Sequence, residues 1–371
     1  MVFRSWRIKM RIVFPVIGHI RYTIQLANAL SKTEETLLLL PKNSKETYSD
    51  LVEDTVKVKT FYRGKRHRYP TNLLGITEIL KHIINFKPDI LHIQSGDFWL
   101  CFVLPILKKY PIVTTVHDPK LHLGEERLHA KFIAQVTRRY TTQTIVHGEE
   151  LKKIMIKEYR AEKETIHVIP HGDYSFYKKW EGKDIQEIGN TILFFGRIWP
   201  YKGLDYLIKA QPLITKEIPD AKIVIAGKGE NFKKYERLMA NKEAFIVYNS
   251  FIPNHMVAEL FQKASVIVLP YVEATQSGVI PIAYAFKKPV VAANVGSIPE
   301  VVDDNKTGYL VPPKNPEKLA EAIIKLLQNK EERKKMGENA YEKMKKEMCW
   351  DNIAKKTIEV YQKAILDVRS R

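Results

Sequence analysis

The chain has 371 residues, more than one hydrophobic core usually serves, and its 45% hydrophobic and 27% charged residues are typical of a folded globular protein. No apolar run approaches the roughly 20 residues of a membrane-spanning helix, and the N-terminal MVFRSWRIKMRIVF lacks the apolar centre of a signal peptide. Two distant cysteines, Cys101 and Cys349, favour neither a disulfide framework nor a zinc site. We therefore expect the protein to reside in a reducing cytoplasm.

The formal net charge is +18. Residues 1–180 hold 30 Lys+Arg and 18 Asp+Glu, an excess of +12, and the remainder holds 30 and 24, an excess of +6. Such an excess attracts the phosphates of nucleic acids, nucleotides or anionic lipids. Lysine-rich surfaces that keep a protein soluble give the same excess, so the charge alone does not decide between these explanations.

Short β-branched runs alternate with amphipathic stretches along the first half of the chain. The runs expected to form strands are 8–17, 36–40, 56–62, 89–94, 111–117, 143–147 and 166–172. Because these runs are apolar with little interruption, both faces of the sheet should be covered, which predicts a mostly parallel sheet.

The same alternation restarts after the polar segment 177–190. The second series of expected strands is 192–195, 221–227, 245–252, 265–271 and 289–295. A helical, Lys/Glu-rich tail follows from about residue 315, and its last helix starts near Trp350. We therefore predict an α/β protein with two doubly wound, Rossmann-like domains, 1–180 and 190–350, and a C-terminal helix, 351–371, that packs back on the first domain.

Candidate site residues follow the predicted strands, because two such sheets facing each other enclose a cleft at their carboxyl ends. Gly18 follows the first strand and opens a helix whose free N–H groups suit an anion. His117 ends the fifth strand, where an Asp-Pro pair fixes a sharp exit; His147 and His171 also end strands. A lone histidine is more often a hydrogen-bonded structural residue, but three in equivalent places favour at least one in the cleft.

The segment FFGRIWPYKG, residues 194–203, places two cations at a strand end. Gly196 lets the backbone approach a ligand, Arg197 offers a planar fork to phosphate oxygens, and Lys202 adds a point charge. This spacing suits a diphosphate; the alternative is a solvated loop. A Gly-x-Gly turn at Gly227 in IAGKGE is a weaker signal of the same kind.

The segment LPYVEATQSGVIPIAY, residues 269–284, carries a polar loop between a strand and a helix. Its candidate residues are Glu273, Thr275, Gln276, Ser277 and Gly278. Their side chains and the free N–H groups of the helix suit sugar hydroxyls and a phosphate. A simple helix cap explains Thr275 or Ser277 but not the whole cluster.

Together these runs resemble the retaining glycosyltransferases of family 4, which have the GT-B fold. The segments that carry the resemblance are FFGRIWPYKGLDYLIKA, IVIAGKGE, SVIVLPY and GVIPIAYAFKKPVVAANVGSIPEVVDDNKTGYLVPP, in that order. The resemblance spans the chain and is most specific over about 190–315. It implies that 1–180 is the acceptor side and 190–350 the nucleotide-sugar side.

The resemblance also implies roles for single residues. Gly18 would lie near the donor phosphates, and His117 would face the donor sugar and the acceptor. Arg197 and Lys202 would bind the diphosphate, and the loop 273–278 would hold the sugar hydroxyls.

One feature departs from the family's pattern. The family usually has two glutamates eight positions apart around this loop, and the second grips the ribose. Counting eight from Glu273 reaches Pro281, and alignment on AYAFKKP puts Ile282 there. The nucleotide base of the donor therefore stays open among UDP-, GDP- and ADP-sugars.

The implied reaction moves a sugar from a nucleotide diphosphate to a hydroxyl of a glycan, glycolipid or small molecule, with retention at the anomeric carbon. No D-x-D motif occurs in the chain, so we expect no metal, with cations stabilising the leaving diphosphate instead. No cofactor is expected beyond the nucleotide-sugar substrate.

The segment FYRGKRHRYP, residues 61–70, interleaves cations with aromatic residues. It could rest on an anionic membrane while a cytoplasmic enzyme reaches a lipid-linked acceptor at the inner face, but charge runs are more often solvated loops.

Two other functions compete with sugar transfer. A nucleotide-sugar epimerase of the same fold would need acidic residues around the sugar, whereas the strand ends here offer mainly histidine. A nucleic-acid binder ranks last, because no recognised DNA or RNA motif accompanies the charge.

Overall fold

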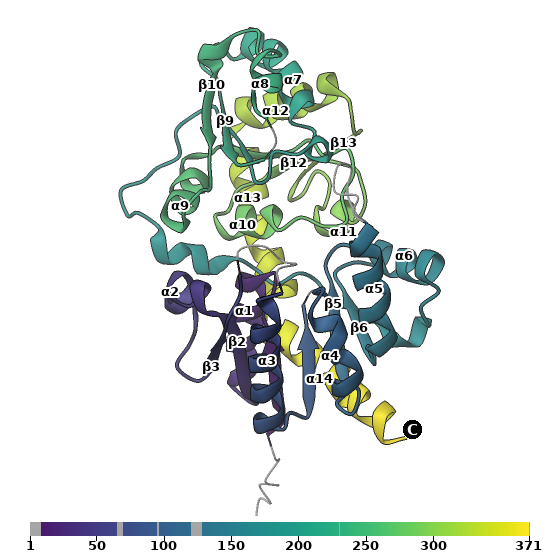
Figure 1. Cartoon of the computed structure of the whole chain (residues 1–371). Coiled ribbons are helices and arrows are strands. Elements are labelled where there is room, and N and C mark those ends of the chain that lie inside the picture. Colours follow the sequence, from purple (N-terminus) through teal and green to yellow (C-terminus); the bar gives the residue numbers. More distant parts are fainter. Residues whose placement is uncertain (1–8, 65–69, 95, 120–127, 230, 371) are drawn as a thin grey trace, which may run out of the picture.

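The computed structural model describes residues 9–64, 70–94, 96–119, 128–229 and 231–370. Within them the chain forms two α/β domains stacked end to end, with the N-terminal domain at the bottom of Figure 1 and the C-terminal domain at the top. The two-domain Rossmann-like prediction is confirmed.

The N-terminal domain is built on a parallel sheet of seven strands. From edge to edge these are β3 (Lys57–Phe61), β2 (Glu35–Pro41), β1 (Arg11–Pro15), β4 (Ile90–Ile93), β5 (Ile112–Val116), β6 (Gln143–Val146) and β7 (Ile166–Val168). The accompanying helices are α1 (Ile20–Ser31), α2 (Lys45–Tyr48), α3 (Asn72–Phe86), α4 (Leu100–Leu107), α5 (Leu128–Tyr140) and α6 (Glu149–Tyr159), with the 3₁₀ turns η1 (Lys42–Ser44), η2 (Ser49–Leu51) and η3 (Lys163–Thr165).

The C-terminal domain repeats the plan on six parallel strands. Their order is β10 (Phe245–Asn249), β9 (Lys222–Gly227), β8 (Thr191–Phe195), β11 (Val266–Leu269), β12 (Val290–Ala293) and β13 (Gly308–Val311). The helices are α7 (Leu204–Glu217), α8 (Lys233–Glu236), α9 (Asn254–Lys263), α10 (Val279–Ala285), α11 (Ile298–Val301), α12 (Pro316–Gln328), α13 (Lys330–Glu347) and α14 (Trp350–Arg369), with η5 (Pro200–Lys202) and η6 (Lys242–Ala244).

Each run predicted to be a strand contains one, and β13 is the strand that the sequence analysis missed. In both sheets the order reverses beside the first strand of the domain: β1 lies between β2 and β4, and β8 lies between β9 and β11. This reversal opens a crevice at the carboxyl ends of β1 and β8, where doubly wound sheets bind ligands.

Helix α14 returns from the C-terminal domain to the N-terminal one, where it contacts α1, β5 and β6 (yellow in Figure 1). Its Trp350 indole donates to the backbone oxygen of Asp173 over 2.9 Å, and the amide of Asp173 donates to the oxygen of Met348 over 2.9 Å. The segment between the domains, including η4 (Ser175–Trp180), is therefore tied to the start of α14.

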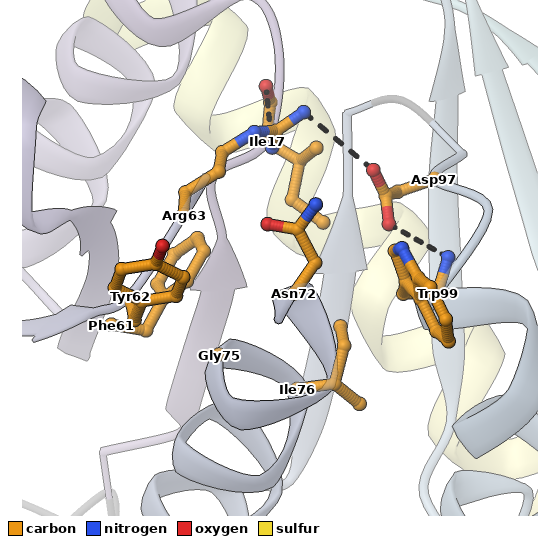
Figure 2. A pocket seen from close by; sticks show the side chains of 9 residues that line it. All are labelled: Ile17, Phe61, Tyr62, Arg63, Asn72, Gly75, Ile76, Asp97 and Trp99. Carbon is orange, nitrogen blue, oxygen red and sulfur yellow. Dashed lines mark hydrogen bonds and ion pairs between the residues drawn. The ribbon is translucent and has the colours of Figure 1, made fainter. Parts of the chain in front are cut away.

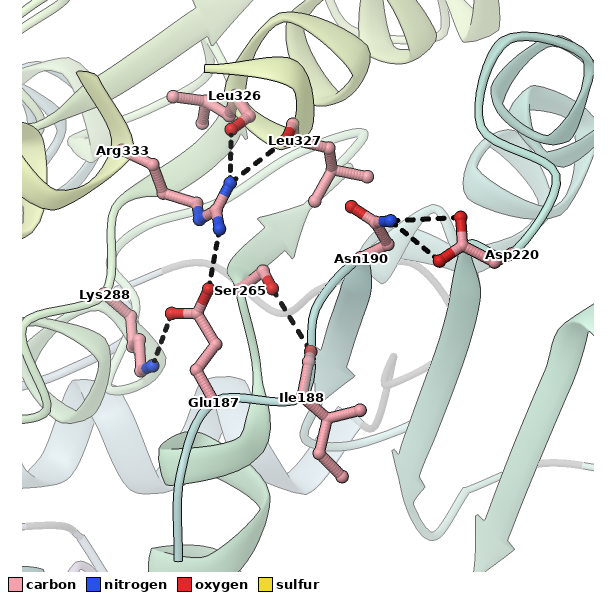
Figure 3. A network of polar contacts seen from close by, with 9 residues as sticks. All are labelled: Glu187, Ile188, Asn190, Asp220, Ser265, Lys288, Leu326, Leu327 and Arg333. Atoms are coloured by element: carbon pink, nitrogen blue, oxygen red, sulfur yellow. Dashed lines mark hydrogen bonds and ion pairs between the residues drawn. The ribbon is translucent and has the colours of Figure 1, made fainter. Parts of the chain in front are cut away.

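A partly buried network of polar side chains fixes the end of this linker to the C-terminal domain (Figure 3). The Glu187 carboxylate accepts from Arg333 over 2.7 Å and from Lys288 over 3.1 Å. Burial alone would raise the pKa of Glu187, but these two cations outweigh it and lower that pKa. The Arg333 guanidinium also donates to the backbone oxygens of Leu326 and Leu327, so it closes the C-terminal end of α12.

Candidate active site

A cavity of about 500 Å³ lies between the two domains at the carboxyl ends of β1 and β8. Its walls come from the start of α1, from Tyr48 of α2, from η4, from the segment after β8 and from the start of α10. The residues that line it are Ile17, Gly18, His19, Ile20, Arg21, Tyr22, Tyr48, Tyr174, Tyr177, Phe195, Gly196, Arg197, Lys202, Gly278, Val279 and Ile282. The cavity thus occupies the ligand position of both sheets.

Five of the residues singled out from the sequence line this cavity: Gly18, Gly196, Arg197, Lys202 and Gly278. The structure therefore brings together residues 260 positions apart in the chain, from both domains. The other candidates do not line it; these are His117, Gly227, Glu273, Thr275, Gln276 and Ser277.

The cavity wall is positively charged. Arg21, Arg197 and Lys202 line it, and no aspartate or glutamate is among the lining residues that the structure describes. The Arg197 guanidinium donates to the hydroxyl of Tyr201 over 2.9 Å, and the Lys202 ammonium lies 3.7 Å from the centre of the Tyr271 ring. Aromatic side chains contact both cations, and the positive charge of the described lining residues suits an anion.

Gly196 and Gly227 support each other at the strand ends. Their φ angles are 121° and 156°, in the region that favours glycine. A Cβ on Gly227 would lie 1.7 Å from the oxygen of Gly196, so no side chain fits there. The structure therefore places Gly227 behind the cavity wall, where it lets the backbone of Gly196 approach a ligand.

His19 lines the cavity from the position next to Gly18, and the sequence analysis missed it. Its backbone is left-handed, with φ 50° and ψ 40°, and it precedes the first residue of α1 without capping that helix by its side chain. The first N–H groups of α1 therefore face the cavity uncapped by a side chain. The His19 ring stacks on the ring of His117, with centroids 3.7 Å apart and planes at 9°.

His117 lies behind His19 and is only 3% exposed. Its Nδ1 is 3.1 Å from Nε2 of His147, and its Nε2 is 3.0 Å from the side-chain oxygen of Gln94. The chain of contacts continues from Gln94 to His92, 3.1 Å away, whose Nδ1 is 2.6 Å from the hydroxyl of Tyr361 on α14. His117 thus belongs to a buried network rather than to the cavity wall.

The direction of the hydrogen bonds in this network follows from one fixed acceptor. The backbone oxygen of Ile169 can only accept, so Nδ1 of His147 carries a proton and, in the neutral ring, Nε2 accepts from Nδ1 of His117. Nε2 of His117 must then accept from Gln94, which requires the amide to be turned by about 180° so that its NH₂ takes the place of the oxygen. With the amide oxygen there instead, His117 or His147 would hold one extra proton.

Burial favours the neutral arrangement. It lowers the pKa of His147 to about 4 and that of His92 to about 3, and it lowers the pKa of His117 well below its ordinary value of 6.5. These rings are therefore neutral near pH 7. A buried set of neutral, hydrogen-bonded rings can hold the His19 ring at the cavity in one position.

The loop after β11 lies beside the cavity and reaches across it. Thr275 donates to the Asp118 carboxylate of the N-terminal domain, and Ser277 accepts from the Val279 amide over 3.2 Å. The side-chain oxygen of Gln276 is buried and has no hydrogen-bond partner within the described ranges. It could accept from a hydroxyl that a ligand brings.

Two further hydrogen-bonding contacts join the domains around the cavity. The Glu300 carboxylate of α11 accepts from the amides of Glu149 and Glu150 over 2.6 and 2.9 Å, so it caps the start of α6 in the other domain. The Arg21 guanidinium donates to the Asn254 side chain over 3.1 Å.

One of the cavity residues that the sequence analysis missed had a recognisable signal in the sequence. His19 directly follows Gly18, just after the first predicted strand. His117 was noticed because it stands at the end of the fifth predicted strand, so His19 could have been noticed for a similar reason. Tyr174 and Tyr177 gave no such signal, because they belong to the stretch around the predicted domain boundary. They line the cavity because η4 crosses it between the domains.

Among the described residues, no three or more histidine, cysteine, aspartate or glutamate side chains are arranged to hold a metal ion. In the same residues, no helix combines the length and the apolar character needed to cross a membrane.

Comparison with known proteins assigns both halves of the chain to sugar transfer. Residues 178–343 match the family model of the glycosyl transferases group 1, and residues 17–172 match that of glycosyltransferase family 4. An uncharacterized glycosyltransferase of Methanocaldococcus jannaschii is 28% identical over 302 residues, which cover 75% of this chain and 76% of that protein.

Solved structures share the fold over nearly the whole length. A glycosyltransferase from Rickettsia africae superposes with a TM-score of 0.74 at 18% identity, covering 96% of this chain and 99% of that one. The Anabaena protein HepE, solved in complex with UDP and glucose, gives a TM-score of 0.71 at 17% identity, covering 95% of this chain and 100% of its own.

Proposed function

The chain belongs to the group 1 glycosyltransferases of family 4, with the GT-B fold, and is an enzyme of the hexosyltransferase type. From this premise we propose that it transfers a sugar from a nucleotide diphosphate sugar to a hydroxyl acceptor, without a metal and with retention at the anomeric carbon. The observation that carries the proposal is the convergence of three cations, Arg21, Arg197 and Lys202, from both domains on one cavity.

The leaving group is the reason that such a wall is useful. When the bond between the anomeric carbon and the phosphate oxygen breaks, negative charge builds on the diphosphate. Arg197, Lys202 and the first N–H groups of α1 are preorganised donors for this charge, which is the largest catalytic contribution in many enzymes. Fixed cations can thereby do the work that a metal does elsewhere.

We assign His19, rather than His117, to the contact with the donor sugar or its phosphates. Its ring reaches the cavity, while His117 supports it from behind. Retention then follows a path on one face of the sugar: the acceptor oxygen bonds to the anomeric carbon and its proton passes to the departing phosphate. Gln276 would accept from a sugar hydroxyl at the neighbouring loop.

The part of the cavity that would hold the nucleotide differs from the family's usual pattern, because Ile282 stands where the family usually has its ribose-binding glutamate. Ile282 lines the cavity together with Val279. Tyr48, Tyr174 and Tyr177 also line the cavity and offer ring faces for a base or a ribose. The complex of the Anabaena protein with UDP supports a uridine donor as the first candidate for this chain.

Thermal shift with UDP-, GDP- and ADP-sugars tests the donor. A donor at one hundred times its dissociation constant should add about 2.7 kcal/mol to the unfolding free energy. A shift with one nucleotide class identifies the base, and no shift with any of the three contradicts a nucleotide-sugar site.

The epimerase alternative is not favoured, because both family models and the matched relative are glycosyltransferases. Incubation of the donor without acceptor separates the two: a glycosyltransferase leaves the sugar's configuration unchanged, and an epimerase converts it.

The cytoplasmic location and the contact of 61–70 with an anionic membrane remain proposals. Residues 65–69 of that segment lie outside the described part of the chain. Arg63 packs inward: its guanidinium lies 3.6 Å from the Asp97 carboxylate and donates to the backbone oxygen of Ile17 over 3.2 Å (Figure 2). Arg63 is therefore committed to the domain, and only the rest of the segment could reach a membrane.

A further inference from the structure

Helix α4, with the sequence LCFVLPIL, contains no polar residue and yet has an exposed face. Helices that are apolar on all sides are normally buried. Here Phe102 is 56% and Ile106 57% exposed, and Pro105 between them is exposed as well. The other residues of the helix are buried against the domain, so the outer face is apolar without taking part in the core.

Aromatic side chains extend this face. Phe98 and Trp99 precede the helix, and their ring centroids lie 5.3 and 6.0 Å from that of Phe102. On the neighbouring helix α5, Phe132 is 47% exposed. We call Phe98, Trp99, Phe102, Pro105, Ile106 and Phe132 the α4 surface.

Exposed lysines adjoin the α4 surface in the sequence. Lys108 and Lys109 follow the helix directly, and Lys131 adjoins Phe132; all three are exposed. Asp97 is the acidic residue nearest in the sequence, and it faces Arg63 on the inner side of the domain (Figure 2). The surface is therefore apolar, and cations stand next to it in the sequence.

We propose that the α4 surface docks the protein on an anionic lipid bilayer. Phe102 and Ile106 would enter the boundary between headgroups and acyl chains, and Trp99 would lie at the level of the headgroups, where indole rings are enriched. The lysines would face anionic headgroups, which attract basic residues near the membrane surface. The uneven charge of the chain, with +12 in residues 1–180, agrees with this orientation.

The position of the surface connects docking with the reaction. Asp97 and Trp99 at the start of α4 line a small cavity beside Ile17, and Ile17 also lines the main cavity (Figure 2). A bilayer against α4 would thus lie on the N-terminal domain, near the mouth of the cleft. If the proposed transfer is correct, this favours a hydroxyl acceptor carried by a lipid; the docking itself does not depend on that function.

Sedimentation of the full chain with vesicles tests the docking. We expect binding to phosphatidylcholine vesicles that contain phosphatidylglycerol, weaker binding without it, and loss with added salt. The double variant Phe102→Ser/Ile106→Ser should lower the affinity at least about tenfold, because two large apolar side chains no longer leave water. Phe251→Ser is the matched control, since Phe251 is 66% exposed in the C-terminal domain.

Several results would overturn the docking. These are absence of wild-type binding at low salt, equal binding by the double variant and the control, and full binding by Lys108→Glu/Lys109→Glu. Sedimentation velocity adds another: a wild-type dimer that the double variant converts to monomers would assign the surface to a second copy of the chain.

Failure of the proposed function has a different signature. In that case vesicle binding persists while no nucleotide sugar shifts the unfolding temperature. Equal unfolding temperatures of the wild type and the double variant show that a loss of vesicle binding is not a loss of folding.

Discussion

His19 has a left-handed backbone, with φ 50° and ψ 40°, that costs a residue with a Cβ about 1 kcal/mol or more. Strain of this kind persists where the surroundings enforce it, and at functional sites it often serves to aim a side chain. Here it aims an imidazole into the cavity and stacks it on His117. The conformation thus supports the role proposed for this ring.

His19→Gly separates the function of this residue from its effect on folding. Glycine relieves strain of about 1 kcal/mol but loses ring stacking worth about 0.5–1.5 kcal/mol, so the unfolding free energy should change little. We expect kcat/KM to fall by about 10²-fold, as for a lost contact with the reacting groups. Urea unfolding and steady-state kinetics measure the two effects; wild-type kcat/KM in His19→Gly would contradict the role.

Arg197 and Lys202 should be needed for the departure of the diphosphate. Replacing either by alanine should lower kcat by about 10²–10³-fold or more, because a preorganised charge no longer meets the leaving group. Tyr201→Phe is a milder comparison, since it removes only the hydroxyl that accepts from Arg197. Near-normal turnover in both alanine variants would refute the diphosphate clamp.

Some of the site residues could be found from the sequence and others could not. Gly196, Arg197 and Lys202 could be found because a strand, a glycine and two cations are adjacent in the chain. The burial of His117 could not be found from the sequence. It depends on the ring of His19, which lies over His117 although it is almost a hundred residues earlier in the chain. Spacing along one strand does not reveal which of two stacked rings faces the cavity.

At the scale of elements, α6 begins in one domain and is capped from the other. The Glu300 carboxylate accepts from two amides of its first turn, and negative charge is favourable at a helix start. Because the cap comes from α11, it exists only while the domains are together around the cavity. It therefore couples the integrity of α6 to closure.

Glu300→Ala should weaken the closed arrangement. Loss of a side-chain cap costs about 0.5–2 kcal/mol, which corresponds to about a 2- to 30-fold rise in the KM of the donor if closure accompanies binding. Glu300→Gln keeps an acceptor oxygen and should lie between the alanine variant and the wild type. Donor KM and small-angle scattering measure affinity and closure; an unchanged KM and radius of gyration in Glu300→Ala would show that the cap has no such role.

The elements were predictable to different degrees for physical reasons. Strands such as β8 and β11 are uninterrupted apolar runs, because helices cover both faces of a parallel sheet. Strand β13, with the sequence GYLV at the edge of its sheet, is short and begins with glycine, so it resembled part of a loop. The turn η4 carries Tyr174 and Tyr177 into the cavity, although its sequence reads as a polar linker.

At the scale of the whole molecule, the buried histidines make folding dependent on pH. Burial lowers the pKa of His171 to about 3, as it does for His92, and that of His147 to about 4. His117 is shifted in the same direction. In the unfolded chain all four would titrate near 6.5.

The sign of the effect follows from proton binding. Below pH 6.5 the histidines of the unfolded chain bind protons, whereas the buried histidines of the folded chain stay neutral. The native state therefore loses stability as the pH falls. Each ring contributes about 1.4 kcal/mol per pH unit until its folded pKa is reached, and four rings together contribute about 6 kcal/mol per pH unit. A protein whose unfolding free energy lies in the lower half of the usual range of about 5–15 kcal/mol should therefore unfold near pH 5.

Urea unfolding at pH 7, 6 and 5, followed by circular dichroism, measures this dependence. The midpoint should fall steeply between pH 6 and 5, well above the range in which carboxylates titrate. His171→Asn removes one of the four rings while keeping a polar side chain, so its slope should be about a quarter smaller. Equal unfolding free energies at pH 7 and pH 5 would mean that the rings are protonated in the folded protein, and the hydrogen-bond directions assigned from Ile169 would then be wrong.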